Sequence, residues 1–154
     1  MSRIDVVQAW LARGETYYNI QGDTQDEVLE SAVKLMPPPK GLKSEEVLAA
    51  LIAREHLMST AIGLGFAVPH PREPIVENSA DSLIAVCYLE HPVVWAAPDD
   101  LPVRTLFIVL SADHGEHLAV LSTVAEAVQR EDFRQFLTTK PTKEELIAFW
   151  RSLN

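Results

Sequence analysis

Two continuous apolar runs constrain the fold of this chain more than any other feature. Residues 83–89 (LIAVCYL) and 105–110 (TLFIVL) contain almost no polar side chain, and turns rich in polar residues or proline bound them. A strand with one face in water alternates apolar and polar residues, so an unbroken apolar run is typical of a strand that is covered on both faces. The two runs therefore predict central strands of a layered domain.

The remaining segments carry the spacing of amphipathic helices. Thr24 with Glu27, and Thr142 with Glu145, have the pattern of capping boxes, which begin helices. We expect helices over about residues 4–11, 24–36, 44–56 (capped by Ser44), 116–130 and 142–153, with strand-like segments at 17–20 and 64–68. Helices interleaved with buried strands predict an α/β domain with a mixed sheet.

Size and charge exclude several classes of function. The 154 residues fit one domain, and the net charge of −9 with scattered basic residues argues against nucleic acid and anionic membrane surfaces as partners. No apolar run approaches the ~20 residues that span a bilayer, and no signal peptide is recognisable. The single cysteine, Cys87, fits a reducing compartment. We therefore expect a cytoplasmic protein that does not insert into membranes.

His70 is the first candidate for chemistry. It lies in the stretch 63–74 (GLGFAVPHPREP), at the end of a strand-like piece, where functional residues of open α/β sheets are often found. Pro69 and Pro71 flank it and restrict its backbone, which suits an imidazole that must point in one direction. A histidine that simply occupies a proline-rich turn is the alternative.

Four other residues are weaker candidates. His117 faces inward on its expected helix, either as a core histidine or as a second group of the same pocket. Arg54 is either a helix-terminal cation or a phosphate ligand. Ser59 and Thr60 lie in a turn without the surroundings of a nucleophile elbow. His114 and His117 have i, i+3 spacing but no third ligand, and we expect His114 to precede the helix, so no metal site is expected.

Residues 54–74 (REHLMSTAIGLGFAVPHPREP) resemble the signature of the fructose- and mannitol-type IIA components of the bacterial phosphotransferase system. The shared elements are Arg-Glu, a Ser/Thr element, a Gly-x-Gly-like element and an apolar stretch that ends in Pro-His. Residues 117–137 (HLAVLSTVAEAVQREDFRQFL) resemble the second histidine helix of that family. The resemblance extends over about residues 24–150, so we expect a IIA domain at 23–154 after an N-terminal extension at 1–22.

The resemblance implies a fold, an activity and partners. The fold is a mixed, roughly five-stranded sheet with helices on both faces. His70 would accept a phosphoryl group from the histidine phosphocarrier protein and pass it to a cysteine of a IIB domain, or keep it as a regulatory mark for a transporter or regulator. Arg54 and His117 match the active-site arginine and second histidine, and Thr60 and Ser59 would lie by the phosphate. No cofactor is implied.

Three departures from the family pattern favour a regulatory relative over a sugar-transport component, and one of them is Phe66, which is bulkier than the usual aliphatic residue. Pro71 stands where a small residue usually follows the active histidine, and proline removes a backbone N–H that phosphate could use. Residues 1–22 add a helix-like segment that transport versions do not need. The resemblance therefore also allows a non-catalytic module that controls a partner by contact.

Overall fold

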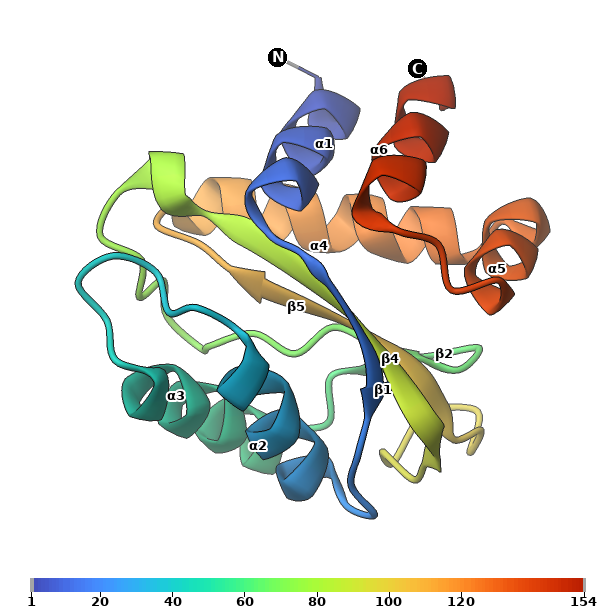
Figure 1. Ribbon diagram of the computed structural model, residues 1–154, viewed down its shortest axis with the longest axis horizontal. Helices are drawn as coiled ribbons and strands as arrows, with labels where there is room; N and C mark the ends of the chain where they lie inside the picture. The colour runs from blue at the N-terminus through green and yellow to red at the C-terminus, as the bar shows by residue number, and fades with distance from the viewer. Residues whose placement is uncertain (1, 154) are drawn as a thin grey trace.

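Five strands form one mixed sheet in the computed structural model, which describes residues 2–153 (Figure 1). The strands are β1 (Thr16–Ile20), β2 (Ala61–Gly63), β3 (Phe66–Ala67), β4 (Leu83–Val93) and β5 (Val103–Leu110), in the order β1-β4-β5-β3-β2. Strands β4 and β5 are antiparallel, as are β2 and β3, whereas β1 is parallel to β4 and β3 to β5. The predicted mixed, five-stranded α/β architecture is confirmed.

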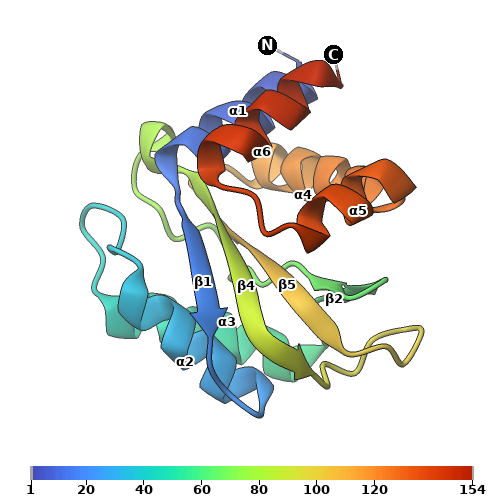
Figure 2. The same cartoon turned by 45° about the vertical axis from the view of Figure 1, so that its right-hand side comes forward.

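Helices cover both faces of the sheet, as expected (Figure 2). They are α1 (Arg3–Arg13), α2 (Gln25–Leu35), α3 (Ser44–Leu57), α4 (His114–Val128), α5 (Glu131–Thr138) and α6 (Lys143–Ser152), with a short 3-10 turn at Ser79–Asp81. Helices α2 and α3 lie on one face, and α1, α4, α5 and α6 lie on the other. Within residues 2–153, no helix is both long enough and apolar enough to cross a bilayer.

The β4–β5 pair explains the two apolar runs. Opposite residues such as Ile84 and Val109, or Val86 and Phe107, are paired across the ladder. Successive side chains of a strand point to opposite faces, and here both faces are covered. Ile84 and Val86 belong to the core beneath α1, α4, α5 and α6, whereas Cys87 belongs to the core beneath α2 and α3. Nearly every position of the two runs therefore carries an apolar side chain, and Thr105 is the exception.

Several helix boundaries differ from the sequence-based expectation. Ser44 is the first residue of α3 and not its cap, because the Glu46 carboxylate accepts the backbone N–H of Lys43 one residue earlier. His114 does not precede its helix but begins α4, where the Asp113 carboxylate accepts the N–H of Glu116. Helix α5 was not predicted, since eight residues give too few turns for a clear apolar period.

The segment expected to be one strand at 64–68 is a turn followed by a very short strand. Gly63 and Gly65 have φ of +91° and +90°, and Leu64 between them has φ of +59°. These values require a turn, since a left-handed backbone does not continue a strand. The Asp99 carboxylate accepts the N–H of Leu64 at 2.8 Å and holds the turn in place. Only Phe66 and Ala67 remain in β3.

The N-terminal segment packs on its own chain. Helix α1 contacts α6, α4 and β4, and its residues Val7, Trp10 and Leu11 are buried in the same core as Trp150 of α6. Strand β1 pairs with β4 as an outer strand of the sheet. Whether residues 1–22 are an extension separate from a domain at 23–154 stays a prediction.

Replacement of Trp10 by alanine tests how far α1 contributes to the stability of the whole fold. Trp10 is only 2 % exposed, so we expect the Trp10→Ala variant to lose about 3–5 kcal/mol in the free energy of unfolding. Urea denaturation followed by circular dichroism measures this loss. Leu35→Ala, at a site that is 55 % exposed, is the control and should change the value far less. If Trp10→Ala lowers the free energy of unfolding no more than Leu35→Ala does, α1 is only loosely attached.

Candidate active site

His70 lies three residues beyond β3, in a backbone that is held from both sides. The N–H of Val68 donates to Thr60 O at 3.0 Å, and the N–H of Val109 in β5 donates to Pro69 O at 2.9 Å. Pro69 and Pro71 are both buried, and the His70 side chain between them is half-buried. The backbone at His70 is therefore fixed by the sheet and by the two proline rings.

A hydrogen bond within this segment determines which ring nitrogen of His70 is free. Its Nδ1 lies 2.6 Å from Val68 O. A carbonyl oxygen can only accept, so Nδ1 carries the proton and donates it. In the neutral ring, Nε2 then has the lone pair and is the atom available for reaction.

His117 brings a second imidazole beside the first. The centroids of the two rings are 4.8 Å apart and the ring planes are inclined by 58°. His117 lies in the first turn of α4 and is buried, as its helical position predicted, and its Nδ1 is 3.2 Å from the hydroxyl of Ser111, which follows β5. The end of β5 and the start of α4 thus place His117 against the segment that carries His70.

Both imidazoles are neutral at pH 7. The pKa of His117 is lowered to about 4, mainly by burial and also by the charge of Arg54 and the charges that His70 and His114 carry when protonated. Burial also lowers the pKa of His70; the hydrogen bond to Val68 O opposes this and the charge of Arg54 adds to it. Because neither ring carries a proton on both nitrogens at pH 7, each has one nitrogen with a free lone pair.

Arg54 supplies the permanent positive charge of the site. It lies in the last turn of α3, where its Nη1 donates to Met58 O at 2.6 Å. Arg54 and Pro71, the residue after His70, line the same open cavity of about 360 Å³. Its charge lowers the pKa of both histidines. The structure thus brings together the three residues that the sequence singled out from three distant segments.

Ser59 and Thr60 have internal partners. The Ser59 hydroxyl donates to the backbone oxygen of Trp95. The Thr60 hydroxyl donates to the Glu55 carboxylate at 2.7 Å, and the Thr60 N–H donates to the same group at 2.6 Å. Phosphate contacts from these two hydroxyls stay a prediction, and they would require the present bonds to rearrange.

Glu55, which follows Arg54 in the Arg-Glu element, has a structural role in the site that was not predicted. Its carboxyl group is buried beneath the turn that joins α3 to β2. Burial raises its pKa, whereas the Thr60 bonds, the nearby Trp95 indole and the charge of Arg54 lower it. The Trp95 indole N–H lies close enough to the Glu55 carboxylate to lower its pKa, although it makes no hydrogen bond of good geometry. An acidic residue in the last turn of a helix opposes the helix dipole, and that could have indicated a specific partner.

The described residues offer no metal centre at this site. The rings of His114 and His117 are 6.5 Å apart between centroids, and residues 2–153 contain no group of three or more His, Cys, Asp or Glu side chains that could hold an ion. What the site does hold is a histidine with a free Nε2, a second neutral imidazole and a guanidinium group. A neutral nucleophile beside hydrogen-bond donors and a positive charge suits the transfer of an anionic group.

This chain matches a protein family and a named relative over most of its length. Residues 11–152 match the family described as "Phosphoenolpyruvate-dependent sugar phosphotransferase system, EIIA 2". The nitrogen regulatory protein of Pseudomonas aeruginosa is 34% identical over 139 residues, which are 88% of this chain and 88% of that protein.

Solved structures share the fold. The crystal structure of nitrogen regulatory protein IIA-Ntr from Neisseria meningitidis has a TM-score of 0.78 at 30% identity, covering 97% of this chain and 99% of that one. An NMR structure of the complex of enzyme IIAMTL and phosphorylated enzyme IIBMTL from Escherichia coli has a TM-score of 0.63 at 21% identity, covering 89% and 94%.

The depressed pKa of His117 predicts a pH dependence of stability. Between its ordinary pKa of 6.5 and the folded value of about 4, the unfolded chain binds a proton that the folded chain excludes. The free energy of unfolding should therefore fall as the pH drops through this window, with no contribution from His117 above it. NMR titration of the His117 Cε1 proton measures the pKa directly, and His117→Gln should reduce the slope. A His117 pKa near 6.5 would contradict this prediction.

Proposed function

The chain belongs to the EIIA 2 family of the phosphoenolpyruvate-dependent sugar phosphotransferase system, and from this premise we propose that it carries a phosphoryl group on Nε2 of His70. The observation that carries the proposal is the hydrogen bond from Nδ1 to Val68 O, which leaves Nε2 with its lone pair. Because Nε2 already has a free lone pair, it needs no base to activate it. The same hydrogen bond holds the ring in one orientation, so the ring reorients little before transfer.

The proposed transfer moves no proton on His70. The lone pair of Nε2 forms the new bond to phosphorus, while the bond between phosphorus and the donor's histidine nitrogen breaks and its electron pair returns to that nitrogen. The other proton of the ring stays on Nδ1 and remains hydrogen-bonded to Val68 O throughout. That carbonyl also stabilises the positive charge that the ring acquires when Nε2 is phosphorylated.

Arg54 and His117 are proposed to stabilise the transferring group. The transition state of phosphoryl transfer spreads negative charge over three equatorial oxygens, and a guanidinium group can bind two of them. His117 can donate from Nε2 if the Ser111 hydroxyl donates to its Nδ1, an arrangement that the 3.2 Å contact permits. Burial of His117 places this donor in a region of low dielectric, where its interaction with charge is strengthened.

The donor and recipient are proposed from the family. We assign the histidine phosphocarrier protein as donor, and a cysteine of a IIB domain or a regulated transporter or regulator as recipient, with all of them meeting in the cytoplasm. Three large apolar side chains are exposed around the histidine pair: Leu57 and Met58 at the end of α3, and Leu118 next to His117. Exposed apolar side chains beside a reactive group support a protein partner at this face.

A regulatory role is favoured over bulk sugar uptake. The two relatives named above at 34% and 30% identity are both nitrogen regulatory proteins, and Pro71 offers no N–H next to His70. The second candidate is a module that controls its partner by contact without being phosphorylated. Its support is the same exposed apolar rim, which can bind a partner whatever the state of His70.

Mass spectrometry of the intact chain tests the carrier proposal. After incubation with phosphoenolpyruvate, enzyme I and the histidine phosphocarrier protein, the wild type should gain one acid-labile phosphate, and His70→Ala should gain none. Phosphorus–proton NMR correlations should place the phosphate on Nε2, because Nδ1 is protonated and bonded to Val68 O. His114→Ala, at an exposed neighbouring imidazole, is the control and should be phosphorylated normally.

Two results would contradict the proposal. A folded wild type that gains no phosphate, even with carrier protein from its native host, would leave the contact-regulated module as the function. A phosphate on Nδ1 would show that the hydrogen bond to Val68 O does not determine the reactive nitrogen.

Removal of the Arg54 charge should slow phosphorylation without unfolding the chain. We expect Arg54→Gln to lower the rate of transfer to His70 by roughly 10²-fold, as for other lost donors to a developing charge. Rapid-quench measurements with phosphorylated carrier protein give the rate. Arg151→Gln, in the last turn of α6, removes the same charge at a remote surface and should leave the rate unchanged. Equal rates for the two variants would exclude Arg54 from the reaction.

A further inference from the structure

A second cavity lies where β4 ends and β5 begins, beneath α5. Its volume is about 390 Å³, within the range of about 300–1,000 Å³ that small-molecule sites occupy. It is bounded by the β2–β3 turn, the last residues of β4, the first residues of β5 and the start of the α5–α6 connection. Its floor is apolar and includes Phe66, Tyr88 and Leu137.

Three basic side chains line this cavity without acidic partners. Across residues 2–153, neither Arg104 nor Arg134 nor Lys140 forms an ion pair. Arg134 donates one N–H to Val128 O, and the side chains of Arg104 and Lys140 donate to no described residue. Glu90 is the one carboxylate in the lining, so the three cations leave a local charge of +2 in a chain of net charge −9. Such a concentration of unpaired positive charge attracts an anion.

Thr105 adds a hydroxyl group with no partner in the chain. The residue is only 6 % exposed and lines the cavity, yet its hydroxyl makes no hydrogen bond to any of the described residues. The hydroxyl oxygen is not among the fully buried polar atoms that lack a partner, so it is accessible from the cavity. Thr105 therefore supplies a free donor and acceptor at the wall of the cavity, beside the three cations.

We infer that this cavity binds a small organic phosphate monoester with an apolar body, of about the size of a nucleoside monophosphate. A phosphate monoester carries about −1.5 to −2 charges at pH 7, which matches the local charge of +2, whereas a monocarboxylate leaves part of it uncompensated. Arginine side chains bind phosphate oxygens in pairs. The apolar floor then receives the body of the ligand, and the Thr105 hydroxyl finds a partner.

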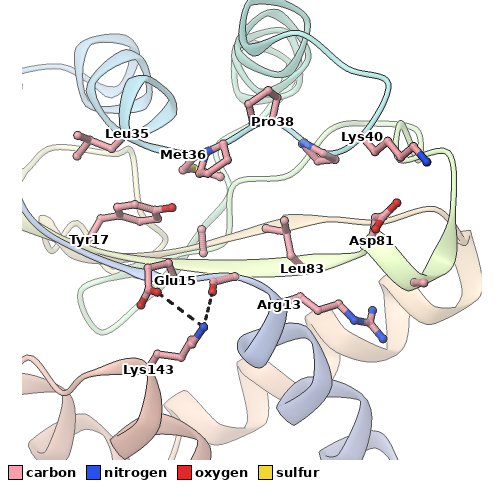
Figure 3. A pocket seen from close by; sticks show the side chains of 15 residues that line it. Arg13, Glu15, Tyr17, Leu35, Met36, Pro38, Lys40, Asp81, Leu83 and Lys143 are labelled. Carbon is pink, nitrogen blue, oxygen red and sulfur yellow. Dashed lines mark hydrogen bonds and ion pairs between the residues drawn. The ribbon is translucent and has the colours of Figure 1, made fainter.

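A larger cavity elsewhere in the molecule provides the contrast. It has a volume of about 620 Å³ and includes Arg13, Lys40 and Lys143 in its lining (Figure 3). Two of these cations are already engaged: Arg13 donates to Ser79 O and Ser82 O, and Lys143 donates to backbone oxygens and lies 3.7 Å from Glu15. The carboxylates of Glu15 and Asp81 also line this cavity and leave it a local charge of +1, so size alone does not select the anion site.

The inferred site is separate from the histidine pair. Thr105 and Val109 both lie in β5. The backbone N–H of Val109 donates a hydrogen bond to the carbonyl oxygen of Pro69, the residue before His70. Val109 is four residue steps along the strand from Thr105, which corresponds to roughly 13 Å. A ligand at Thr105 therefore leaves Nε2 of His70 accessible, yet it touches β3 and β5, the two strands that lead to the histidine pair.

Binding to the full chain can be followed by amide NMR and calorimetry, with AMP as the probe. AMP should shift the amides of Gly65 and Thr105 and bind at least about tenfold more tightly than adenosine or inorganic phosphate, because each of these lacks one half of the inferred ligand. No binding at millimolar AMP would overturn the inference. Equal binding of adenosine, or shifts around Arg13 and Lys40 instead, would overturn it as well.

Two variants in the cavity and one matched control locate the site. Arg104→Gln and Thr105→Val should each weaken AMP binding by about tenfold, since each removes a polar contact to the ligand. Thr105→Val should leave stability unchanged or slightly raised, because its hydroxyl has no intramolecular partner. Lys40→Gln removes an equal charge from the larger cavity and should bind AMP as the wild type does. If Arg104→Gln and Lys40→Gln bind AMP equally, the inference fails.

The outcome is independent of the proposed carrier function. Arg104→Gln should accept phosphate on His70 at the wild-type rate, because the cavity lies at the opposite end of β5. A chain that is phosphorylated normally but binds no AMP disproves the second site alone, and a chain that binds AMP but gains no phosphate disproves the carrier proposal alone.

Discussion

The antiparallel pairing of β4 with β5 is the interaction on which the rest of the structure depends. Both strands are apolar on both faces, so they are stable only when helices cover each side. Strand β1 then adds in parallel to β4, and β3 adds in parallel to β5. Because β3 and β5 run in the same direction, the segments that follow them, with His70 and His117, emerge at the same end of the sheet.

The chemistry of the histidine pair follows from that placement. Burial keeps both rings neutral at pH 7, and the hydrogen bond to Val68 O selects one nitrogen of His70. The buried Glu55 carboxylate ties the turn before β2 to the end of α3, which carries Arg54. A site of this kind works by position and charge, which agrees with phosphoryl transfer as the reaction its family serves.

The basic side chains at the two ends of the sheet have different neighbours. At one end, Arg54 lies beside two neutral imidazoles and above a buried carboxylate. At the other, Arg104, Arg134 and Lys140 line a cavity with an apolar floor and have no ion-pair partner among the described residues. The three cations and Glu90 leave that cavity a local charge of +2 in a chain of net charge −9, and this charge is the basis of the inferred anion site.

Much of the architecture could be predicted from the sequence because it depends on local patterns. The two apolar runs indicated the central strands, and the helical spacing placed His117 inward, since burial on a helix follows its period. The position of Arg54 at the end of a helix left two roles open, and the resemblance to a family favoured phosphate binding. Local patterns failed where the structure depends on distant contacts. The Gly63–Gly65 turn depends on Asp99, and α5 is stabilised by burial of Phe133 and Leu137. The start of α4 is different, because its Asp113 cap is a local signal that was missed.

Only the tertiary structure decided the geometry of the sites. It placed the ring centroids of His70 and His117 4.8 Å apart and paired Glu55 with Thr60. It also left the Thr105 hydroxyl without a partner in the chain at a cavity wall. The physical reason is that apolar periodicity records burial, whereas hydrogen bonds and charge contacts between distant segments leave no periodic trace in the sequence. The sequence by itself determined which residues could react; the packing of two covered strands decided which of them meet.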